Sequence, residues 1–244
     1  MTTDLSVCQS ALARDPILYL DLTEAVRRGD GRVLGATPHG ALVSFNNYEK
    51  NGQELGFTMF ANDLETVEEL LALLPPEPDF ITVHETLYFG LLKERFGCDG
   101  MNPCWQMGWL HTDPLPLPSA DAQIRQLDLS HLPIVLANYS LTDESYLSWL
   151  IGRGELYGAF DGNTLMAFIG RHAEGSIGLL EVLPQYRRRG LATLLQSYMV
   201  NLELSRGHIP YGQVFDGNEP SLALQRSLGM AQSKGQLYWA ARDN

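Results

Sequence analysis

One unit of this sequence restricts the fold more than any other: a short apolar strand, a basic loop and an amphipathic helix in direct succession. Residues 177–183 (IGLLEVL) have the composition of a buried strand, and residues 184–186 (PQY) turn the chain. Residues 187–192 (RRRGLA) form the densest positive cluster in a chain whose formal net charge is −12. Apolar residues then recur at helical spacing to about residue 206. A strand joined to a helix by so short a loop predicts a mixed α/β architecture.

The start of the predicted helix has the chemistry of an anion site. The first turn of a helix presents backbone N–H groups without intrahelical partners, and the helix dipole places positive charge there. Three guanidinium groups precede this turn, and Gly190 and Ala192 would let an anion approach the main chain closely. A diphosphate suits this arrangement. The alternative is an ordinary solvated basic face, and the loop sequence alone does not separate the two.

The same segment resembles the acyl-coenzyme A loop of the GNAT acyltransferase superfamily, since it reads R-x-x-G-x-A after a strand ending in VLPQY. Downstream, Asn218, Ser221 and Gly229 stand at the spacing of the family's next helix, with Met230 in place of its usual aromatic residue. The resemblance covers roughly residues 121–244 and is nearest to the branch that contains glycine N-acyltransferases. It implies a GNAT fold with the element order β-α-α-β-β-β-α-β-α.

The resemblance implies acetyl-CoA or another acyl-CoA as the cofactor. In the family, the loop and the beginning of the helix bind the diphosphate, and main-chain N–H groups at the end of the preceding strand contact the pantetheine arm. Asn218 would lie near that arm, although asparagine also favours the N-cap of a helix for its own sake. The predicted cofactor-binding residues are Val182, Leu183, Arg187, Arg188, Arg189, Gly190, Leu191, Ala192, Thr193, Asn218 and Ser221.

Glu181 is the first candidate for the base that removes a proton from an acceptor amine. Period-two alternation places Leu180 and Val182 on one face of the strand, and Ile177, Leu179 and Glu181 on the other. Both faces are otherwise apolar, so a buried carboxyl is expected, and burial makes a carboxyl a better proton acceptor near neutral pH. The alternative is a carboxylate paired with a neighbouring arginine, which would take no part in the chemistry.

Four other polar residues of the second half are further candidates. Asp216 is a second candidate base or else a simple turn residue. His172 and His208 titrate in a suitable range but lie in predicted loops. Gln213 would hydrogen-bond either the acceptor substrate or a buried backbone group.

The composition describes an ordinary globular protein and argues against several classes. No window approaches the ~20 apolar residues that span a bilayer, and the first residues do not resemble a secretory signal, so a cytoplasmic protein without membrane attachment is expected. Three irregularly spaced cysteines predict neither a disulfide framework nor a zinc site, and no metal is expected. Residues 1–120 carry 17 acidic and 7 basic side chains, whereas residues 121–244 carry 12 and 10. The acidic first half disfavours a nucleic-acid partner and tolerates a small cationic amine.

Alternating prolines at residues 114–118 predict a stiff connector between two domains. We expect an N-terminal α/β domain over residues 1–118, in the form of a degenerate GNAT-like half, and the acyl-CoA-binding catalytic domain over residues 119–244. Trp105 and Trp109 would wall a cleft between the halves or pack in their interface. The elements predicted in the first half are strands at 31–36, 41–45, 58–61 and 80–84, helices at 63–74 and 88–96, and a strand or helical turn at 17–22.

The leading hypothesis is an N-acyltransferase, in its simplest form an N-acetyltransferase, which moves an acyl group from acyl-CoA to the amine of a small molecule or amino acid by direct attack. An acyl-CoA-binding sensor without catalysis is the alternative. Many GNAT enzymes have a tyrosine four residues after the position of Ser221, whereas this chain has Gln225, which can donate a hydrogen bond but cannot act as a general acid at neutral pH. An aminoacyl-tRNA-dependent transferase is a third hypothesis, which the acidic balance disfavours. A monomer or homodimer is expected.

Overall fold

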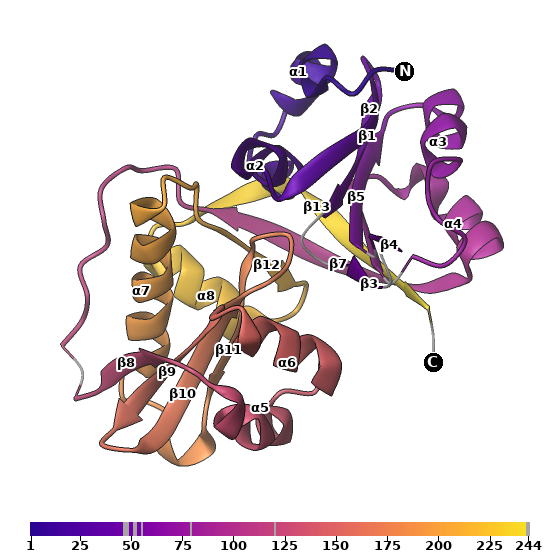
Figure 1. The fold of residues 1–244 in the computed structure, drawn as a ribbon. Coiled ribbons are helices and arrows are strands. Elements are labelled where there is room, and N and C mark those ends of the chain that lie inside the picture. The colour runs from indigo at the N-terminus through magenta and orange to yellow at the C-terminus, as the bar shows by residue number, and fades with distance from the viewer. Residues whose placement is uncertain (46–48, 51–52, 55, 79, 120, 243–244) are drawn as a thin grey trace.

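The computed structural model of this protein describes residues 1–244 except 46–48, 51–52, 55, 79, 120 and 243–244. Its strands form a seven-stranded sheet, a four-stranded sheet and a two-stranded ribbon of β3 (Glu49–Lys50) and β4 (Gln53–Glu54). Helices cover both larger sheets, and the molecule has two lobes (Figure 1). The predicted mixed α/β class is confirmed. Within the described ranges, no helix combines the length and the apolar character needed to cross a membrane.

The seven-stranded sheet combines strands from both ends of the chain. β7 (Cys98–Gly108) lies between β13 (Ala231–Arg242) and β12 (Tyr211–Phe215) and is antiparallel to both. Backbone hydrogen bonds therefore connect the two sides of the predicted boundary at residue 118, and the division into two domains stays a prediction. The remaining strands of this sheet are β1 (Gly31–Thr37), β2 (Gly40–Phe45), β5 (Gly56–Ala61) and β6 (Phe80–Val83).

Helices pack on both faces of this sheet. Asp63 begins α3 by accepting a hydrogen bond from the Thr66 N–H at 2.8 Å, as its position in the sequence predicts. The ambiguous segment 17–22 is resolved as helix from Leu20 onward. β7 was not predicted, because Gly100 and Pro103 interrupt its apolar pattern. The helices of the first half are α1 (Gln9–Leu12), α2 (Leu20–Arg28), α3 (Leu64–Leu71) and α4 (Phe89–Phe96), with short 3-10 turns η1 (Leu5–Cys8) and η2 (Thr86–Tyr88).

The four-stranded sheet is an antiparallel meander, as predicted, in the order β11-β10-β9-β8. One face is covered by α5 and α6 through residues such as Val135 and Leu147, and the other is covered by α7 through Leu195 and Met199. α8 follows β12 in the chain. The elements of this half are β8 (Gln123–Gln126), η3 (Leu129–His131), α5 (Leu132–Asn138), α6 (Glu144–Gly152), β9 (Leu156–Asp161), β10 (Thr164–Arg171), β11 (Ile177–Val182), η4 (Pro184–Tyr186), α7 (Leu191–Ser205) and α8 (Glu219–Ser227).

A bulge in β11 overturns the predicted alternation of this strand. Leu179 has a φ of 54°, in the left-handed region, and the pairing register with β10 shifts at the same place. Ile177 consequently packs on the α7 side together with Leu180 and Val182, whereas Leu179 packs on the side of α5 and α6. The prediction that Ile177 and Leu179 share a face was wrong because one extra residue interrupts the two-residue period.

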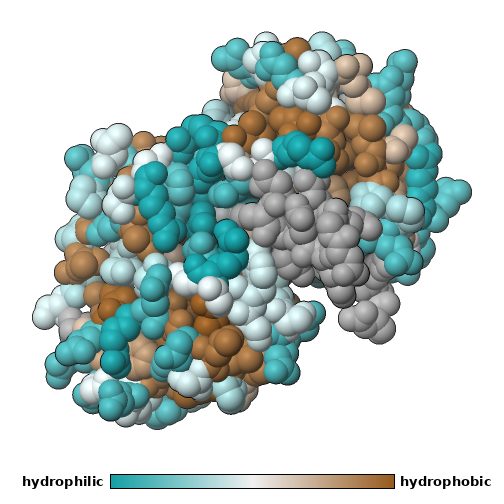
Figure 2. Space-filling model, viewed as in Figure 1, coloured by the Kyte–Doolittle hydropathy of each residue, from teal (hydrophilic) through white to brown (hydrophobic). Residues whose placement is uncertain are grey.

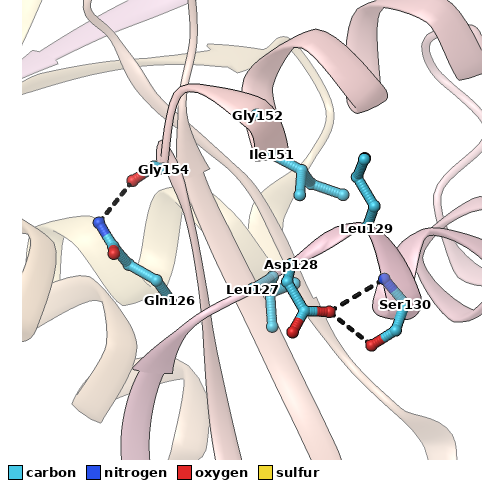
Figure 3. A pocket seen from close by; sticks show the side chains of 8 residues that line it. All are labelled: Gln126, Leu127, Asp128, Leu129, Ser130, Ile151, Gly152 and Gly154. Carbon is cyan, nitrogen blue, oxygen red and sulfur yellow. Dashed lines mark hydrogen bonds between the residues drawn. The ribbon is translucent and has the colours of Figure 1, made fainter.

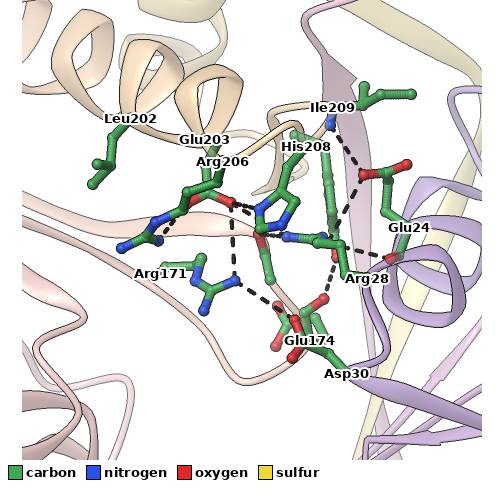
Figure 4. Close-up of polar contacts among 12 residues, drawn as sticks. Glu24, Arg28, Asp30, Arg171, Glu174, Leu202, Glu203, Arg206, His208 and Ile209 are labelled. Atoms are coloured by element: carbon green, nitrogen blue, oxygen red, sulfur yellow. Dashed lines mark hydrogen bonds and ion pairs between the residues drawn. The ribbon is translucent and has the colours of Figure 1, made fainter.

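A group of charged residues joins the first half to the second and is here termed the junction cluster (Figure 4). Its centre is Glu203, whose side chain is 1% exposed and lies 3.4 Å from Arg28, 2.7 Å from Arg206 and 2.8 Å from His208. Hydrophilic side chains also gather where the two lobes meet on the face shown in Figure 2. The junction cluster comprises Glu24, Arg27, Arg28, Asp30, Glu155, Arg171, Glu174, Glu203, Arg206 and His208.

Candidate functional site

The loop between β11 and α7 has the backbone shape of an open anion site. A 3-10 turn, closed by the Tyr186 N–H donating to the Leu183 carbonyl at 2.8 Å, reverses the chain after β11. Arg188 and Gly190 then adopt φ values of 65° and 77°, both in the left-handed region. No described heavy atom lies within 4 Å of the point where a Cβ on Gly190 would stand. The space in front of this glycine is open to a ligand.

The N-terminus of α7 has no protein cap. Gly190 is its N-cap residue, no side chain accepts a hydrogen bond there, and the first turn contains no acidic residue. The N–H groups of this turn keep their hydrogen-bonding capacity, and the helix dipole makes them a positive end. Leu191 anchors the turn because its side chain is buried in the core between α7 and the four-stranded sheet, and Ala192 and Thr193 follow it. A fixed, uncapped helix start is the arrangement that binds phosphate oxygens in proteins.

The three arginines of the loop differ in what they already bind. Arg187 donates from Nε to the Val182 carbonyl and from its terminal nitrogen to the Glu181 carboxylate, each at 3.1 Å. Arg188 and Arg189 are exposed, and neither lies within 4 Å of a carboxylate in the part of the chain that the structure describes. Arg189 lies over the Tyr186 ring, with its guanidinium carbon 5.8 Å from the ring centroid. Two of the three positive charges are therefore available to an anion.

β11 and β12 are edge strands of different sheets, and they meet without pairing to each other. The Ile177 carbonyl oxygen lies 2.8 Å from the position of a Cβ on Gly212, so only glycine allows this close approach. The outer edge of β11 therefore keeps backbone groups that an extended ligand could bind. We term the line along which β11 faces β12 the seam.

The structure distinguishes the two predicted backbone contacts on β11. The Leu183 N–H donates to the Met166 carbonyl at 3.0 Å, so it is occupied within the protein. Neighbouring residues of an antiparallel strand point their N–H groups to opposite sides, which directs the Val182 groups outward. The bond from Arg187 to the Val182 carbonyl agrees with that direction. Val182 can fill the predicted role, and Leu183 cannot do so through its N–H.

Glu181 is in an ion pair, which is the alternative that the sequence left open. Its side chain is 27% exposed and accepts a hydrogen bond from Arg187. The charge of Glu181 also acts on the nearby Tyr139. Burial raises the pKa of Tyr139 to about 12, and repulsion from Glu174 and Glu181 adds to this effect. To accept a proton from a substrate, Glu181 would first have to leave Arg187.

Asp216 and Gln213 are each held by a tryptophan. The exposed Asp216 carboxylate accepts a hydrogen bond from the Trp105 indole at 2.9 Å, and the Gln213 amide oxygen accepts one from the Trp239 indole at 2.5 Å. The other end of Gln213, its Nε2, is buried and has no partner among the described residues. A buried donor without a partner is unusual enough to require an explanation, and a bound ligand would supply one.

Asn218 performs the capping role that asparagine favours at helix starts. Its side chain accepts a hydrogen bond from the Ser221 N–H at 3.3 Å and caps α8. Gln225, one turn further along the helix, donates to the Ser221 hydroxyl at 3.4 Å. The Gln225 side chain is 4% exposed, and its Oε1 has no partner in the described structure. The position where many GNAT enzymes have a tyrosine is therefore buried and contains no group that can release a proton.

An open depression elsewhere on the second half contains none of the predicted site residues (Figure 3). Asp128 caps η3 by accepting from the Ser130 N–H at 2.9 Å, and Gln126 donates to the Gly154 carbonyl at 3.1 Å. These polar groups already satisfy one another. The depression is lined by Gln126, Leu127, Asp128, Leu129, Ser130, Ile151, Gly152 and Gly154.

A second group of residues, His172, Tyr146 and Trp239, lies beside the seam, and the sequence alone gave little indication of it. His172, in the turn between β10 and β11, faces the hydroxyl of Tyr146 on α6 and the ring of Trp239 on β13. Tyr146 and His172 are 26 residues apart, and no spacing rule predicts that they meet. Only the general suitability of histidine for proton transfer pointed to His172.

Comparisons with known proteins agree on the fold. Residues 156–240 match the family model described as FR47-like protein. The structure is similar to a Drosophila protein solved by the Northeast Structural Genomics Consortium, with a TM-score of 0.62 and 18% identity over 83% of this chain and 79% of that one. It is also similar to a Novosphingobium aromaticivorans protein assigned to the GNAT-family acetyltransferases (TM-score 0.56, 20% identity, 93% and 97% covered). A third similar structure is a GCN5-related N-acetyltransferase from Sphaerobacter thermophilus (TM-score 0.53, 16% identity, 98% and 91% covered).

This chain has the mixed α/β fold of the GNAT acetyltransferases, as the resemblance predicted. The FR47-like match covers β9 to most of β13 and so includes the arginine loop. No curated protein matches the chain. The narrower resemblance to the glycine N-acyltransferase branch is not supported by these comparisons.

Proposed function

We propose that this protein is an acyl-CoA-dependent N-acyltransferase that moves an acyl group, in the simplest case acetyl, to the amine of a small molecule or amino acid. The single observation that carries the proposal is the uncapped start of α7 beside Arg188 and Arg189, whose charges no described carboxylate neutralises. The matching family model over this segment and the shared fold support it. Acyl-CoA brings an activated thioester, and the chain would supply binding, orientation and proton transfer.

The residues present fit the cofactor. Arg188, Arg189 and the N–H groups of the first turn of α7 would hold the diphosphate, because Gly190 leaves the main chain accessible. The pantetheine arm would follow the seam, where Val182 offers an outward N–H. The buried, unpartnered Nε2 of Gln213 offers a donor on the opposite strand.

Proton transfer in the proposed reaction needs an acceptor for the amine proton and a stabilising group for the departing thiolate. Glu181 and Asp216 remain candidate bases, although each already has a hydrogen-bond partner, Arg187 and Trp105. Gln225 could stabilise a thiolate only by donating a hydrogen bond, because an amide has no proton to release at neutral pH. The proton for the thiolate would come from water or from the base itself.

The test is cofactor binding by the double variant Arg188→Glu, Gly190→Asp. It reverses one free charge and places a carboxylate where the diphosphate is proposed to bind. A hydrogen bond to a charged group contributes about 1.5–3 kcal/mol, so we expect CoA affinity to fall by at least about 100-fold in calorimetry. The exposed Arg14 provides a control for the charge reversal, since Arg14→Glu reverses one arginine charge far along the chain without adding the carboxylate of Gly190→Asp. Equal affinity of the double variant and the control would reject the placement of the loop, provided circular dichroism shows both folded.

A non-catalytic acyl-CoA sensor is the second candidate, and the buried Gln225 favours it, because the chain has an amide where a hydroxyl acid is common. The two functions differ in one measurement. An enzyme releases free thiol from acetyl-CoA when an amine is present, whereas a sensor binds acetyl-CoA tightly and releases none with any amine of a broad set.

A further inference from the structure

His172 lies where three elements meet beside the seam. The centroid of its ring is 6.2 Å from that of Trp239 on β13, and its Nδ1 is 3.2 Å from the hydroxyl of Tyr146 on α6. The Nε2 atom lies 2.5 Å from the position of a Cβ on Gly178, so the imidazole edge rests on the β11 backbone, and a larger residue at position 178 would displace the ring. Gly178 directly follows Ile177, where β11 and β12 approach each other.

The hydrogen bonds around Tyr146 allow a tautomer of His172 that can accept a proton. The Tyr146 oxygen accepts from the Ala173 N–H at 3.1 Å, and its second lone pair can accept from His172 Nδ1–H. In that tautomer Nε2 keeps its lone pair, and no described residue donates to it. Tyr146 also fixes the ring plane, because the two rings are stacked with an interplanar angle of 18°.

The surroundings of His172 favour the neutral, proton-accepting form. Burial lowers the pKa of His172 below its ordinary value, and the nearby Glu174 carboxylate opposes this effect without reversing it. From the other elements, the groups that face the ring are the Tyr146 hydroxyl of α6 and the uncharged indole of Trp239. Unlike Glu181, His172 has no ion pair to break before it can act.

His172 also lies at the end of the seam where the thioester is proposed to bind. The diphosphate is proposed to bind at the end of β11 near Val182, and Gly178 lies four residues back, about 10 Å along the strand because the bulge at Leu179 takes up one residue. The arm between the diphosphate and the thioester would run in this direction. Gln213, whose buried Nε2 lacks a partner, is held there by Trp239.

We propose that His172, oriented by Tyr146, accepts the proton of the acceptor amine, and that the acceptor carries an aromatic or apolar group that packs against Trp239 and Phe215. This inference rests on the proposed acyl transfer. The amine nitrogen uses its lone pair to form the bond to the acyl carbon, and the carbon–sulfur bond breaks with its electron pair remaining on sulfur. The amine proton goes to His172 Nε2, and the imidazolium then returns it to the thiolate or to water, which restores the neutral ring.

The acceptor class follows from the aromatic side chains beyond His172. Trp239 stacks on Phe80 at 5.4 Å with an interplanar angle of 12°, and the Phe215 ring lies 6.3 Å from Trp239. Phe215 is 36% exposed, which is unusual for so large an apolar side chain. A flat or apolar substituent beside the amine would cover it, and burying such a group contributes about 1.5–3 kcal/mol.

The experiment measures thiol release from acetyl-CoA with 2-phenylethylamine and with ethylamine, across pH, for the wild type and His172→Gln. We expect His172→Gln to lose at least about 100-fold in rate, the lower bound for general base catalysis. We also expect the pH–rate profile of the variant to lose its acid limb, which is the fall in rate below the ordinary histidine pKa of about 6.5. Tyr146→Phe removes the partner of Nδ1 and should shift that limb with a smaller loss of rate. The exposed His39 is the control, because His39→Gln changes an equivalent residue on the surface.

The outcomes separate this inference from the proposed function. CoA binding by calorimetry should be unchanged in His172→Gln, and failure of the wild type to bind CoA would reject the proposed function instead. Equal rates and equal pH profiles for wild type and His172→Gln overturn the role of His172. Equal kcat/KM for the two amines overturns the acceptor class, since we expect about a tenfold preference for 2-phenylethylamine that Trp239→Ala abolishes.

A binding measurement that needs no turnover provides a further test of the role of His172. If the wild type binds CoA but acylates neither amine, proton NMR of the imidazole decides the question, with the His172 resonance assigned by its loss in His172→Gln. In the CoA complex, 2-phenylethylamine should shift this resonance, and ethylamine should shift it less. An unmoved His172 resonance at saturating 2-phenylethylamine overturns the proposal.

Discussion

The arginines before α7 and the arginines of the junction cluster differ in how their charge is matched. In the junction cluster, Arg171 lies 2.7 Å from Glu155, Arg206 lies 2.7 Å from Glu203, and Arg28 lies 3.4 Å from Glu203 (Figure 4). At the start of α7, Arg188 and Arg189 are exposed and no described carboxylate pairs with them. The chain is strongly acidic, so unmatched arginines are not explained by a shortage of carboxylates.

This difference indicates two functions for one residue type. A buried guanidinium surrounded by carboxylates connects segments that are far apart in sequence, as Arg28 of α2 does when it reaches Glu203 of α7. An exposed guanidinium beside an uncapped helix start adds positive charge where positive charge is otherwise unfavourable. The first arrangement pairs its charges within the protein, although Arg28 Nη2 and Glu174 Oε2 have no hydrogen-bond partner among the described residues. The second becomes favourable when an anion binds.

The largest effect is expected from breaking the junction cluster. Glu203→Gln leaves Arg28 and Arg171 without one of their carboxylates in a site where Glu203 is 1% exposed. Removing one partner of a buried ion pair costs about 3–5 kcal/mol, and urea unfolding should show a loss of this size. The exposed Glu77→Gln is the control and should change the free energy of unfolding by less than about 0.5 kcal/mol. A Glu203 variant as stable as the control would show that the cluster does not stabilise the junction.

A second buried pair, Asp21 and His84 in the first half, extends the comparison to the pH dependence of stability. Burial alone would raise the pKa of Asp21, but His84 at 3.0 Å, together with hydrogen bonds from Thr58 and Gln106, outweighs this effect and lowers that pKa. Burial alone would lower the pKa of His84, but Asp21, together with the Met59 carbonyl and the Glu85 carboxylate, outweighs this effect and raises that pKa. The contribution of Asp21 is therefore lost as pH falls through its lowered pKa, and that of His84 is lost as pH rises through its raised pKa.

Both contributions are present between about pH 4 and pH 6.5, the ordinary values of the two groups. We expect the wild type to lose about 1.5–3 kcal/mol of stability outside this window, the range for a hydrogen bond to a charged group. The double variant Asp21→Asn, His84→Gln should have a flatter profile of melting temperature against pH. Parallel profiles for the two proteins would contradict the assignment.

Local patterns in the sequence predicted most of the fold. The strand, loop and helix around the arginines depend on residues close in sequence, and the structure has them at Ile177–Val182, Pro184–Tyr186 and Leu191–Ser205. The caps at Asp63 and Asn218 were readable for the same reason, because a cap is a contact over three residues. The placement of β7 between β12 and β13 was not readable, since strand order is fixed by contacts across more than 100 positions.

The candidate site was predictable to the same extent. The uncapped start of α7 depends on neighbouring residues and was predicted from the sequence, whereas the occupied Leu183 N–H was not. Anion binding at this helix start stays a prediction. The choice between a free and a paired Glu181 depended on the rotation of Arg187, which no pattern encodes. The contacts of His172 with Tyr146 and Trp239 depend on tertiary packing and the β11 bulge, so they emerged only from the structure.

Single truncations test whether the free arginines differ from the matched ones. Arg188→Ala and Arg189→Ala should each weaken CoA binding by about 1.5–3 kcal/mol, roughly tenfold to 100-fold, because each removes a hydrogen bond between charged groups. Neither should change the free energy of unfolding by more than about 0.5 kcal/mol, since no described carboxylate is left unpaired. Affinity should also fall as salt is added, because these charges are exposed to solvent. Calorimetry at two salt concentrations measures both effects, and a loss of stability without a loss of affinity would reverse the interpretation.

The smallest effect should come from Arg187, which belongs to the loop but resembles the junction arginines in having a partner. Its guanidinium already binds Glu181 and the Val182 carbonyl, so less of its charge is available to a ligand. The pair is exposed, and such pairs contribute about 0.2–1 kcal/mol. Arg187→Ala should therefore weaken CoA binding by less than about fivefold while releasing Glu181, and the Glu181→Gln variant should affect binding equally little. Arg187→Ala could instead weaken CoA binding as much as Arg188→Ala does. In that case, Arg187 would bind the cofactor despite its ion pair with Glu181. Glu181 would then be released from Arg187 whenever the cofactor is bound.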